Sequence, residues 1–329
     1  VSTGLVLIVL GLQGSDRAAP VAVERQLAGP RWTVANSPIA EIAERARPAI
    51  VQLRVETGDQ AETRSGVIFR TDGHVLTNAR VVGGATSVRA LLASGREVAA
   101  KVVGRDPDTD TAVVKLDGGP FPVATLGSAM DLHVGQTAVA IGSSVTVGVI
   151  SALHREVRPL GETQTLFDMI QTDARVAPES SGGALLDENG AVIGITSALA
   201  TDGPGAASPG FATTIDVARS VADELIRTGR VVHPWLGIEG TDVHGLAAEL
   251  DVEGGAMVAQ VKSGSPAAIG GLARRDVIVG VNGRPVHSMG ELVVMVRAIG
   301  PGGVANLDLV RDGRRRSVTV VLAARPVSS

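Results

Sequence analysis

Short β-type segments, separated by turn signals, follow one another closely from Ala49 to Ile215. They include "SGVIF", "HVLTN", "TAVVKLD", "QTAVAIG" and "AVIGITSA". Short segments at this spacing are typical of an antiparallel barrel or sandwich. A Gly/Pro break at "DGGPFPVATLG" divides them into two consecutive groups, each of about six segments. The sequence therefore predicts two paired β-barrels.

Composition limits what the chain can be built from and what it can bind. The 329 residues suit two or three domains, and a 44% hydrophobic but only 2% aromatic composition predicts a core of Val, Ala, Leu and Ile. The formal net charge of -4 provides no general attraction to nucleic acid or anionic lipid. The absence of cysteine excludes disulfides, thiolate metal sites and a cysteine nucleophile.

The N-terminus carries one apolar run, Leu5–Leu12. A bilayer-spanning helix needs about 20 apolar residues, so this run is too short as it stands. No basic residues precede it, as they would in a secretory signal. We interpret residues 1–36 as a partial membrane anchor and a linker, the linker being the Gly-, Pro- and Ala-rich stretch 14–35. A poor signal sequence and a strand are the alternatives.

Two helices are expected to flank the barrels. "SPIAEIAERA" predicts a short helix capped near Ser37, and "IDVARSVADELIRTG" predicts an amphipathic helix that closes the double barrel. We expect Asp216 to be the N-cap of the second helix and Gly229 to end it.

From Trp235 onward strands and short helices alternate, which indicates a separate α/β domain. Ser288 and Glu291 have capping-box spacing at the start of one helix, and Asp312-Gly313 predicts a tight hairpin turn. We interpret the run Arg314–Arg316 as the solvated end of this hairpin rather than as a polyanion site.

Two motifs carry residues that could perform chemistry. In "QTDARVAPESSGGALLD", Ser181 precedes two glycines on a turn, which leaves its hydroxyl and the nearby backbone accessible to a substrate. In "RDPDTDTAVVKLD", Asp110 enters a buried strand. Each motif alone is more typical of an ordinary turn.

Together these segments resemble one family. "SGVIFRTDGHVLTNARVV", "DPDTDTAVVKLD", "QTDARVAPESSGGALLDENGAVIGI" and "GFATTIDVARSVADELIRTGRVVHPWLGI" occur in the order and at the spacing of HtrA/DegP-type serine proteases. "GAMVAQVKSGSPAAIGGLARRDVIVGVNGRPV" is similar to the PDZ module of that family. The resemblance spans Ser37 to Pro326. It implies a mostly β fold, with a chymotrypsin-like double β-barrel over residues 37–230 and an α/β PDZ domain over residues 231–326.

The resemblance assigns the catalytic positions. Ser181 corresponds to the nucleophile and Asp110 to the carboxylate that orients the base, but Arg80 occupies the position of the general-base histidine. A guanidinium group keeps its proton at physiological pH, because its pKa lies above about 12, so Arg80 cannot accept the proton of the serine hydroxyl. Loss of the base costs about a million-fold in turnover. His74, His133 and His154 do not match the base position.

A second departure concerns the oxyanion hole, which in the family uses the backbone N–H groups of the serine and of a glycine two residues before it. These positions are Ser181 and Glu179, so a carboxylate stands where glycine is expected, and it opposes a developing negative charge. The connection "IGSSVTVGVIS" is also shorter than the Gly/Pro-rich loop of the family. We expect Arg80 to neutralise the buried carboxylate of Asp110 through a charge-assisted hydrogen bond.

The PDZ resemblance implies that an extended peptide is added as a strand beside "WLGI", which comprises Trp235, Leu236, Gly237 and Ile238. The N–H groups around the last three would receive a terminal carboxylate. The alternative is that "WLGI" is simply a core strand.

Three functions are compatible with these features. The preferred one is a proteolytically inactive HtrA relative that binds unfolded or extended polypeptides and protein C-termini as a chaperone, scaffold or regulator in protein quality control. The others are an active endopeptidase with an unrecognised base, and an adaptor that uses the PDZ domain alone. The resemblance implies an extracytoplasmic, membrane-tethered protein that assembles as a trimer or together with active relatives. No metal, organic cofactor or nucleic-acid site is expected.

Overall fold

The computed structural model describes residues 37–160, 162, 164–199, 209–243 and 252–326. The anchor and linker expected over residues 1–36 lie outside the described residues. Within the described ranges, no helix is both long and apolar enough to cross a bilayer.

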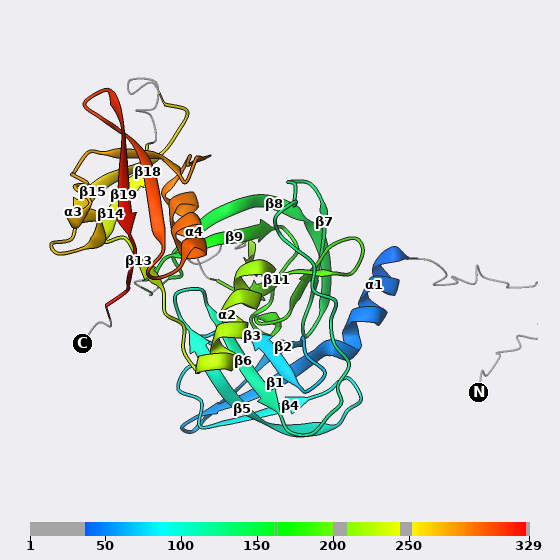
Figure 1. Cartoon of the computed structure of the whole chain (residues 1–329). Helices are drawn as coiled ribbons and strands as arrows, with labels where there is room; N and C mark the ends of the chain where they lie inside the picture. The colour runs from blue at the N-terminus through cyan, green and yellow to red at the C-terminus, as the bar shows by residue number, and fades with distance from the viewer. Residues whose placement is uncertain (1–36, 161, 163, 200–208, 244–251, 327–329) are drawn as a thin grey trace, which may run out of the picture. The chain divides into compact units, whose positions relative to one another are not determined.

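The first group of strands forms a closed barrel with the order β1-β2-β3-β6-β5-β4 (Figure 1, blue to cyan). Every neighbouring pair is antiparallel, and buried Val, Leu, Ile and Ala side chains fill the interior. The strands are β1 (Ile50–Thr57), β2 (Gln60–Ile68), β3 (His74–Thr77), β4 (Ser87–Leu91), β5 (Glu97–Asp106) and β6 (Thr111–Leu116).

The second group closes into another barrel, with the order β10-β11-β12-β9-β8-β7 (Figure 1, green). The two barrels confirm the prediction made from the strand spacing. The strands are β7 (Thr137–Ile141), β8 (Val145–Val157), β9 (Leu166–Thr172), β10 (Ala184–Leu186), β11 (Val192–Ser197) and β12 (Gly210–Thr214).

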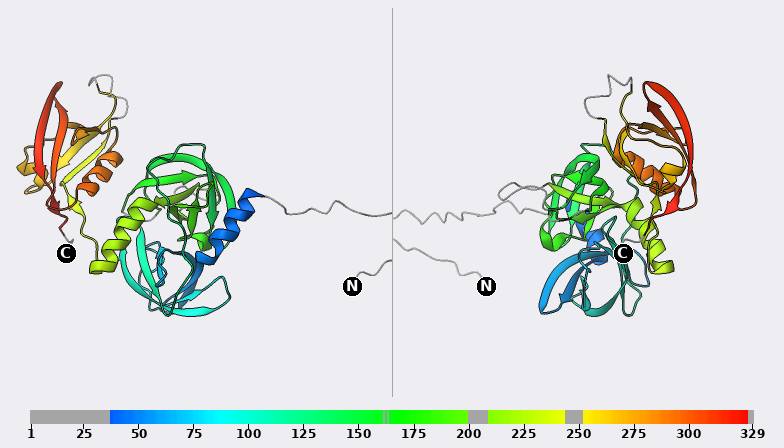
Figure 2. Two further views of the ribbon diagram at one scale, coloured as in Figure 1. Left: turned by 45° about the vertical axis from the view of Figure 1, so that its right-hand side comes forward. Right: turned by 90° about the vertical axis from the view of Figure 1, so that its left-hand side faces the viewer.

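Helices α1 (Pro38–Ala46) and α2 (Ile215–Thr228) share one apolar core with strands of both barrels. This shared core fixes the barrels relative to each other, and Figure 2 shows α2 beside them from two further sides. A short 3₁₀ turn, η1 (Arg47–Ala49), joins α1 to β1.

The ends of α2 bear out one sequence expectation and correct another. Gly229 ends the helix in the left-handed conformation, with φ of 74°, as expected. The N-cap is Thr214 rather than Asp216. The carboxylate of Asp216 instead accepts hydrogen bonds from the backbone N–H of Ala129 at 2.6 Å and the hydroxyl of Ser128 at 3.3 Å, because the chain leading into β7 passes over the start of the helix.

The C-terminal domain has a sheet of order β14-β15-β16-β18-β19, with β17 paired to β16 (Figure 2, yellow to red). Ser288 caps α4 by accepting from the N–H of Glu291 at 3.1 Å, and Asp312-Gly313 forms the expected turn, with Arg311 paired to Arg314. The elements are β13 (Pro234–Trp235), β14 (Ile238–Asp242), β15 (Ala256–Val261), α3 (Pro266–Ile269), β16 (Val277–Val281), β17 (Arg284–Pro285), α4 (Met289–Ile299), β18 (Val304–Arg311), β19 (Arg314–Val321) and β20 (Ala323–Ala324).

Gly104 on β5 allows the C-terminal end of α2 to approach the first barrel closely. A Cβ atom built on Gly104 would lie 2.8 Å from the carbonyl oxygen of Gly229 and 2.9 Å from a methyl group of Leu225. We expect Gly104→Ala to reduce the free energy of unfolding by about 1–3 kcal/mol, because the helix must move outward.

The matched control is Gly83→Ala, where the new methyl group would meet nothing nearer than 3.5 Å. This substitution should change stability by less than about 0.5 kcal/mol. Urea unfolding of the two variants measures the difference, and equal stabilities would contradict this account of the helix packing.

Candidate active site

The three residues assigned by resemblance come from different elements and meet between the barrels. Arg80 lies in the turn that follows β3, and Asp110 immediately precedes β6, both in the first barrel. Ser181 follows η2 (Pro178–Ser180), a 3₁₀ turn that leads into β10 of the second barrel. Asp110 is held at a positive φ of 50°, which is uncommon for a residue with a side chain.

Arg80 makes the contact with Asp110 that the sequence predicts. Its Nη2 lies 2.6 Å from Oδ2 of Asp110, and its Nε lies 3.2 Å from Oδ1 and 3.1 Å from Oδ2. The backbone N–H of Arg80 and the hydroxyl of Ser197 also donate to this carboxylate. Only 5% of the Asp110 side chain is exposed. The buried negative charge is therefore neutralised by a cation and further satisfied by two other donors.

The hydroxyl of Ser181 is bonded to an amide rather than to a base. Its Oγ donates to Oδ1 of Asn78 at 2.8 Å and accepts from the N–H of Ala198 at 3.3 Å. A neutral carboxamide oxygen accepts a hydrogen bond but does not take up a proton at physiological pH. These two hydrogen bonds orient the serine hydroxyl, and neither partner is a base.

Asn78 was not singled out from the sequence. It is completely buried, and its amide group also donates to the carbonyl oxygen of Asp110 at 3.4 Å. The available signal was its place in "TNAR", two residues before Arg80, at a point where the chain leaves a buried strand.

The turn that carries Ser181 is closed on itself. The backbone N–H of Ser181, one of the two expected oxyanion donors, bonds to the carbonyl oxygen of Pro178 at 3.1 Å. A substrate carbonyl would have to displace this bond before it could receive the N–H. Glu179 is exposed, and among the described residues its side chain has no hydrogen-bond or ion-pair partner. In this conformation the oxyanion donor is blocked by the hydrogen bond within the turn, more than by the carboxylate of Glu179.

Side chains from three neighbouring segments fasten this turn. Ser65 donates to the carbonyl oxygen of Glu179 at 2.8 Å, and Thr196 donates to that of Ser180 at 2.7 Å. The hydroxyl groups of Ser143 and Ser180 lie 2.9 Å apart. Ser143 belongs to the connection between β7 and β8 that the sequence marked as short. This short connection therefore contacts the serine turn directly.

Four of the five histidines among the described residues pair with carboxylates away from Ser181, and the exposed His133 makes no hydrogen bond with Ser181 either. His74 pairs with Asp72, His154 with Asp168, His233 with Asp106 and His287 with Glu291, at distances between 2.7 and 3.0 Å. None of the four contacts Ser181. The described residues contain no cluster of three or more potential metal ligands.

His154 and Asp168 form a separate pair on β8 and β9, and both residues have positive φ angles. Nδ1 of His154 lies 2.7 Å from Oδ1 of Asp168, and the hydroxyl of Thr214 donates to the other carboxylate oxygen. The hydrogen bond to Asp168 raises the pKa of His154 above 6.5, against the opposing effect of burial.

The C-terminal domain contains the segment expected to receive a peptide. Gly237, between β13 and β14, has φ of 85°, and a Cβ atom there would lie 2.1 Å from that of Ser265. Among the described residues, the backbone N–H groups of Leu236 and Gly237 donate to no protein acceptor. A groove adjoins this segment, and α4 contributes apolar side chains to it, namely Met289, Leu292, Val293 and Val296.

Comparisons with known proteins agree with this architecture. A trypsin-like peptidase domain model matches residues 64–195, and a PDZ domain model matches residues 234–322. Serine protease PepD of Mycobacterium tuberculosis is 36% identical over 359 residues, a match that covers 98% of this chain and 75% of the relative. The structure of the HtrA-type protease AlgW with a tripeptide superposes with a TM-score of 0.76 at 35% identity and covers 88% of this chain and 98% of that one.

This chain belongs to the HtrA family of trypsin-like serine proteases. A DegP-like protein of Pseudomonas fluorescens, described as a probable periplasmic serine endoprotease, is 38% identical over 301 residues. The match covers 88% of this HtrA chain but only 62% of that relative. The chain thus spans about three fifths of the length of such DegP-like proteins.

The ion pair at the HtrA base position gives a first prediction for this site. Arg80→Ala should reduce the free energy of unfolding by about 3 kcal/mol, because it leaves a buried carboxylate without a counter-charge. In an Asp110→Asn background the same substitution should cost less than half as much. Chemical unfolding of the four proteins in this cycle measures the coupling.

The exposed pair Arg89–Glu97 is the control for this cycle, since both of its side chains are nearly half exposed. Arg89→Ala should cost less than about 1 kcal/mol. Equal losses from Arg80→Ala in the two backgrounds would show that the pairing does not stabilise the fold.

The His154–Asp168 pair gives a prediction about pH. The pKa of His154 is higher in the folded protein than the value of 6.5 for the unpaired side chain. The pair therefore stabilises the fold fully below pH 6.5, and this contribution is lost as the pH rises through the folded pKa. NMR titration of His154 should give a pKa above 6.5, and Asp168→Asn should lower it. A pKa unchanged by that substitution would contradict the assignment.

Proposed function

We propose that this HtrA-family chain is proteolytically inactive and that it binds unfolded or extended polypeptides as a chaperone, scaffold or regulator in protein quality control. The observation that carries the proposal is the arginine at the base position, bonded to Asp110, while Ser181 donates to the amide of Asn78. Among the described residues, the hydroxyl then has no neighbour that can take its proton when a carbonyl group is attacked.

Peptide binding is supported by the PDZ domain. The free N–H groups of Leu236 and Gly237 are suited to a terminal carboxylate, and the apolar side chains of α4 are suited to the side chains of an extended peptide. The relative AlgW has been solved with a tripeptide and with a decapeptide. This groove is the site at which we propose that this chain binds protein C-termini.

The names of the relatives favour a second candidate, an active serine endopeptidase that degrades misfolded proteins. Ser181, Asp110 and the surrounding frame are retained, and the similar curated proteins are described as proteases. This candidate needs a base that the described residues around Ser181 do not supply. The word periplasmic in the name of the DegP-like relatives supports an extracytoplasmic location. Membrane tethering and assembly into trimers or mixed oligomers remain predictions.

Incubation with unfolded casein tests the inactivity. We expect the wild-type protein to leave casein intact and to behave like Ser181→Ala, because the hydroxyl is never deprotonated. Electrophoresis of the digests over a day measures this. Cleavage by the wild-type protein that disappears in Ser181→Ala would establish the second candidate instead.

Two neighbouring valines on α4 test the groove. Val293 lines it, whereas Val294 does not. Val293→Glu should weaken the binding of unfolded casein by about tenfold or more, because a charge replaces an apolar side chain on the α4 wall of the groove, and Val294→Glu should leave it unchanged. Fluorescence anisotropy of labelled casein measures both affinities. Equal effects of the two substitutions would mean that the groove does not hold the polypeptide.

A further inference from the structure

The PDZ sheet has two unlike edges. Strand β14, beside which a peptide is expected, forms one edge, and β19 forms the other. The first three residues of β19 are Arg314, Arg315 and Arg316, all exposed, as the interpretation of a solvated hairpin end requires. Charged side chains on an edge strand resist pairing with other chains.

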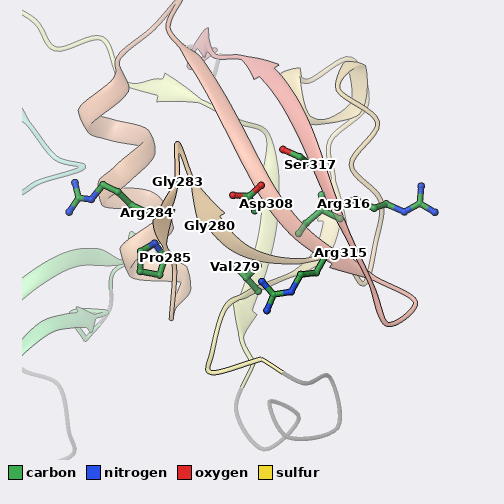
Figure 3. A pocket seen from close by; sticks show the side chains of 10 residues that line it. Val279, Gly280, Gly283, Arg284, Pro285, Asp308, Arg315, Arg316 and Ser317 are labelled. Carbon is green, nitrogen blue, oxygen red and sulfur yellow. The ribbon is translucent and has the colours of Figure 1, made fainter.

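An open hollow of about 460 Å³ lies beside these arginines. Arg284 on β17 lines the hollow from the other side. Gly280 and Gly283 also line the hollow and have no side chains to fill it. Figure 3 shows the guanidinium group of Arg315 near Val279, while Arg284 and Arg316 extend outward on opposite sides. The cationic groups diverge. A single small anion would need converging donors, so this arrangement suits a broad surface that carries many negative charges.

One carboxylate, that of Asp308, also lines the hollow and offsets part of the positive charge, but it forms no ion pair with these arginines. Among the described residues, Arg284 and Arg314–Arg316 form no ion pair, whereas Arg311, two positions before Gly313, is engaged by the buried Asp276 at 2.6 Å. The chain as a whole carries a formal charge of -4, so this edge is a local concentration of positive charge on an acidic protein. Such a patch attracts an anionic surface, because its positive charges are not paired with carboxylates.

Apolar side chains accompany the arginines along the same edge. Ile269 at the end of α3 is 82% exposed, and Val321 at the end of β19 is 59% exposed. Helix α3 packs against β19, since a Cβ atom on Gly270 would lie 2.7 Å from a methyl group of Val320. Both lie toward the opposite end of β19 from Arg314–Arg316. Exposed aliphatic side chains on the same edge as cations favour the interface of a lipid bilayer over the phosphate backbone of a nucleic acid, which cannot receive them.

In place of the interpretation of Arg314–Arg316 as only a solvated hairpin end, we propose that this arginine edge, defined as Arg284, Arg314–Arg316, Ile269 and Val321, binds the surface of an anionic lipid bilayer. The apolar run Leu5–Leu12 supplies a second lipid-directed feature in the same chain, and two weak signals together give stable attachment where one does not. Because β14 is the opposite edge of the sheet, the peptide groove stays accessible while the arginine edge is occupied. The proposal is independent of whether Ser181 is active.

The test is sedimentation of the full chain with vesicles of phosphatidylcholine, either pure or containing about 30% phosphatidylglycerol. We expect binding to the anionic vesicles that weakens as sodium chloride rises from about 0.05 M to about 0.5 M. Replacing Arg314, Arg315 and Arg316 together by Gln should reduce this binding by about tenfold or more. The corresponding Lys triple variant should retain it, because a bilayer is recognised by charge rather than by bidentate geometry.

A matched control removes the same charge elsewhere, by replacing the exposed Arg155, Arg227 and Arg230 with Gln. This variant should bind anionic vesicles like the wild type. Equal losses in the control and the edge variant, equal binding to neutral vesicles, or loss of binding in the Lys variant would each overturn the proposal. So would retention of an RNA homopolymer without any binding to vesicles. Unchanged casein binding by the edge variant shows that its PDZ domain is folded.

Discussion

The structure around the active site depends on the burial of one carboxylate, that of Asp110. A charge that is 95% covered must be paired or lose its ionisation, and in a working protease a histidine shares this task with catalysis. Arg80 pairs with the carboxylate but cannot act as the catalytic base. Its guanidinium group neutralises the carboxylate more completely than an imidazole would, since it donates from two nitrogens, but it accepts no proton. Under the proposed function, arginine at this position preserves the fold and supplies no base.

Other contacts at the site hold the serine turn in its closed conformation. Asn78 holds the serine hydroxyl, the N–H of Ser181 is turned back onto Pro178, and Ser65 and Ser143 fasten the turn from outside. Each bond satisfies a buried polar group that would otherwise be costly. Several separate interactions thus favour the closed turn. Restoring a base alone would leave the oxyanion donor engaged, so recovery of activity requires the turn to open as well.

The sequence was sufficient where local chemistry decides the structure. Strand spacing predicted both barrels, and turn chemistry predicted the Asp312-Gly313 hairpin. The Arg80–Asp110 contact was predicted because the family resemblance assigns both residues to one site, where a buried charge needs a partner. It was insufficient where distant segments meet. The hydrogen bonds of Asn78 with Ser181 and of Ser143 with Ser180 depend on how the two barrels pack. Asp216 accepts a hydrogen bond from Ala129 rather than capping its own helix, because the chain leading into β7 passes over the start of that helix. Such contacts leave no periodic signal in the chain.

The most direct measurement is the rate at which a fluorophosphonate probe labels Ser181, followed by mass spectrometry, in the wild-type protein and in the double variant Arg80→His with Glu179→Gly. The account predicts negligible labelling of the wild type and measurable labelling of the double variant, because a histidine restores the base and a glycine lets the serine turn reopen. Rapid labelling of the wild-type protein at Ser181 would contradict it, since the hydroxyl would then be activated by a group other than the one that arginine has replaced.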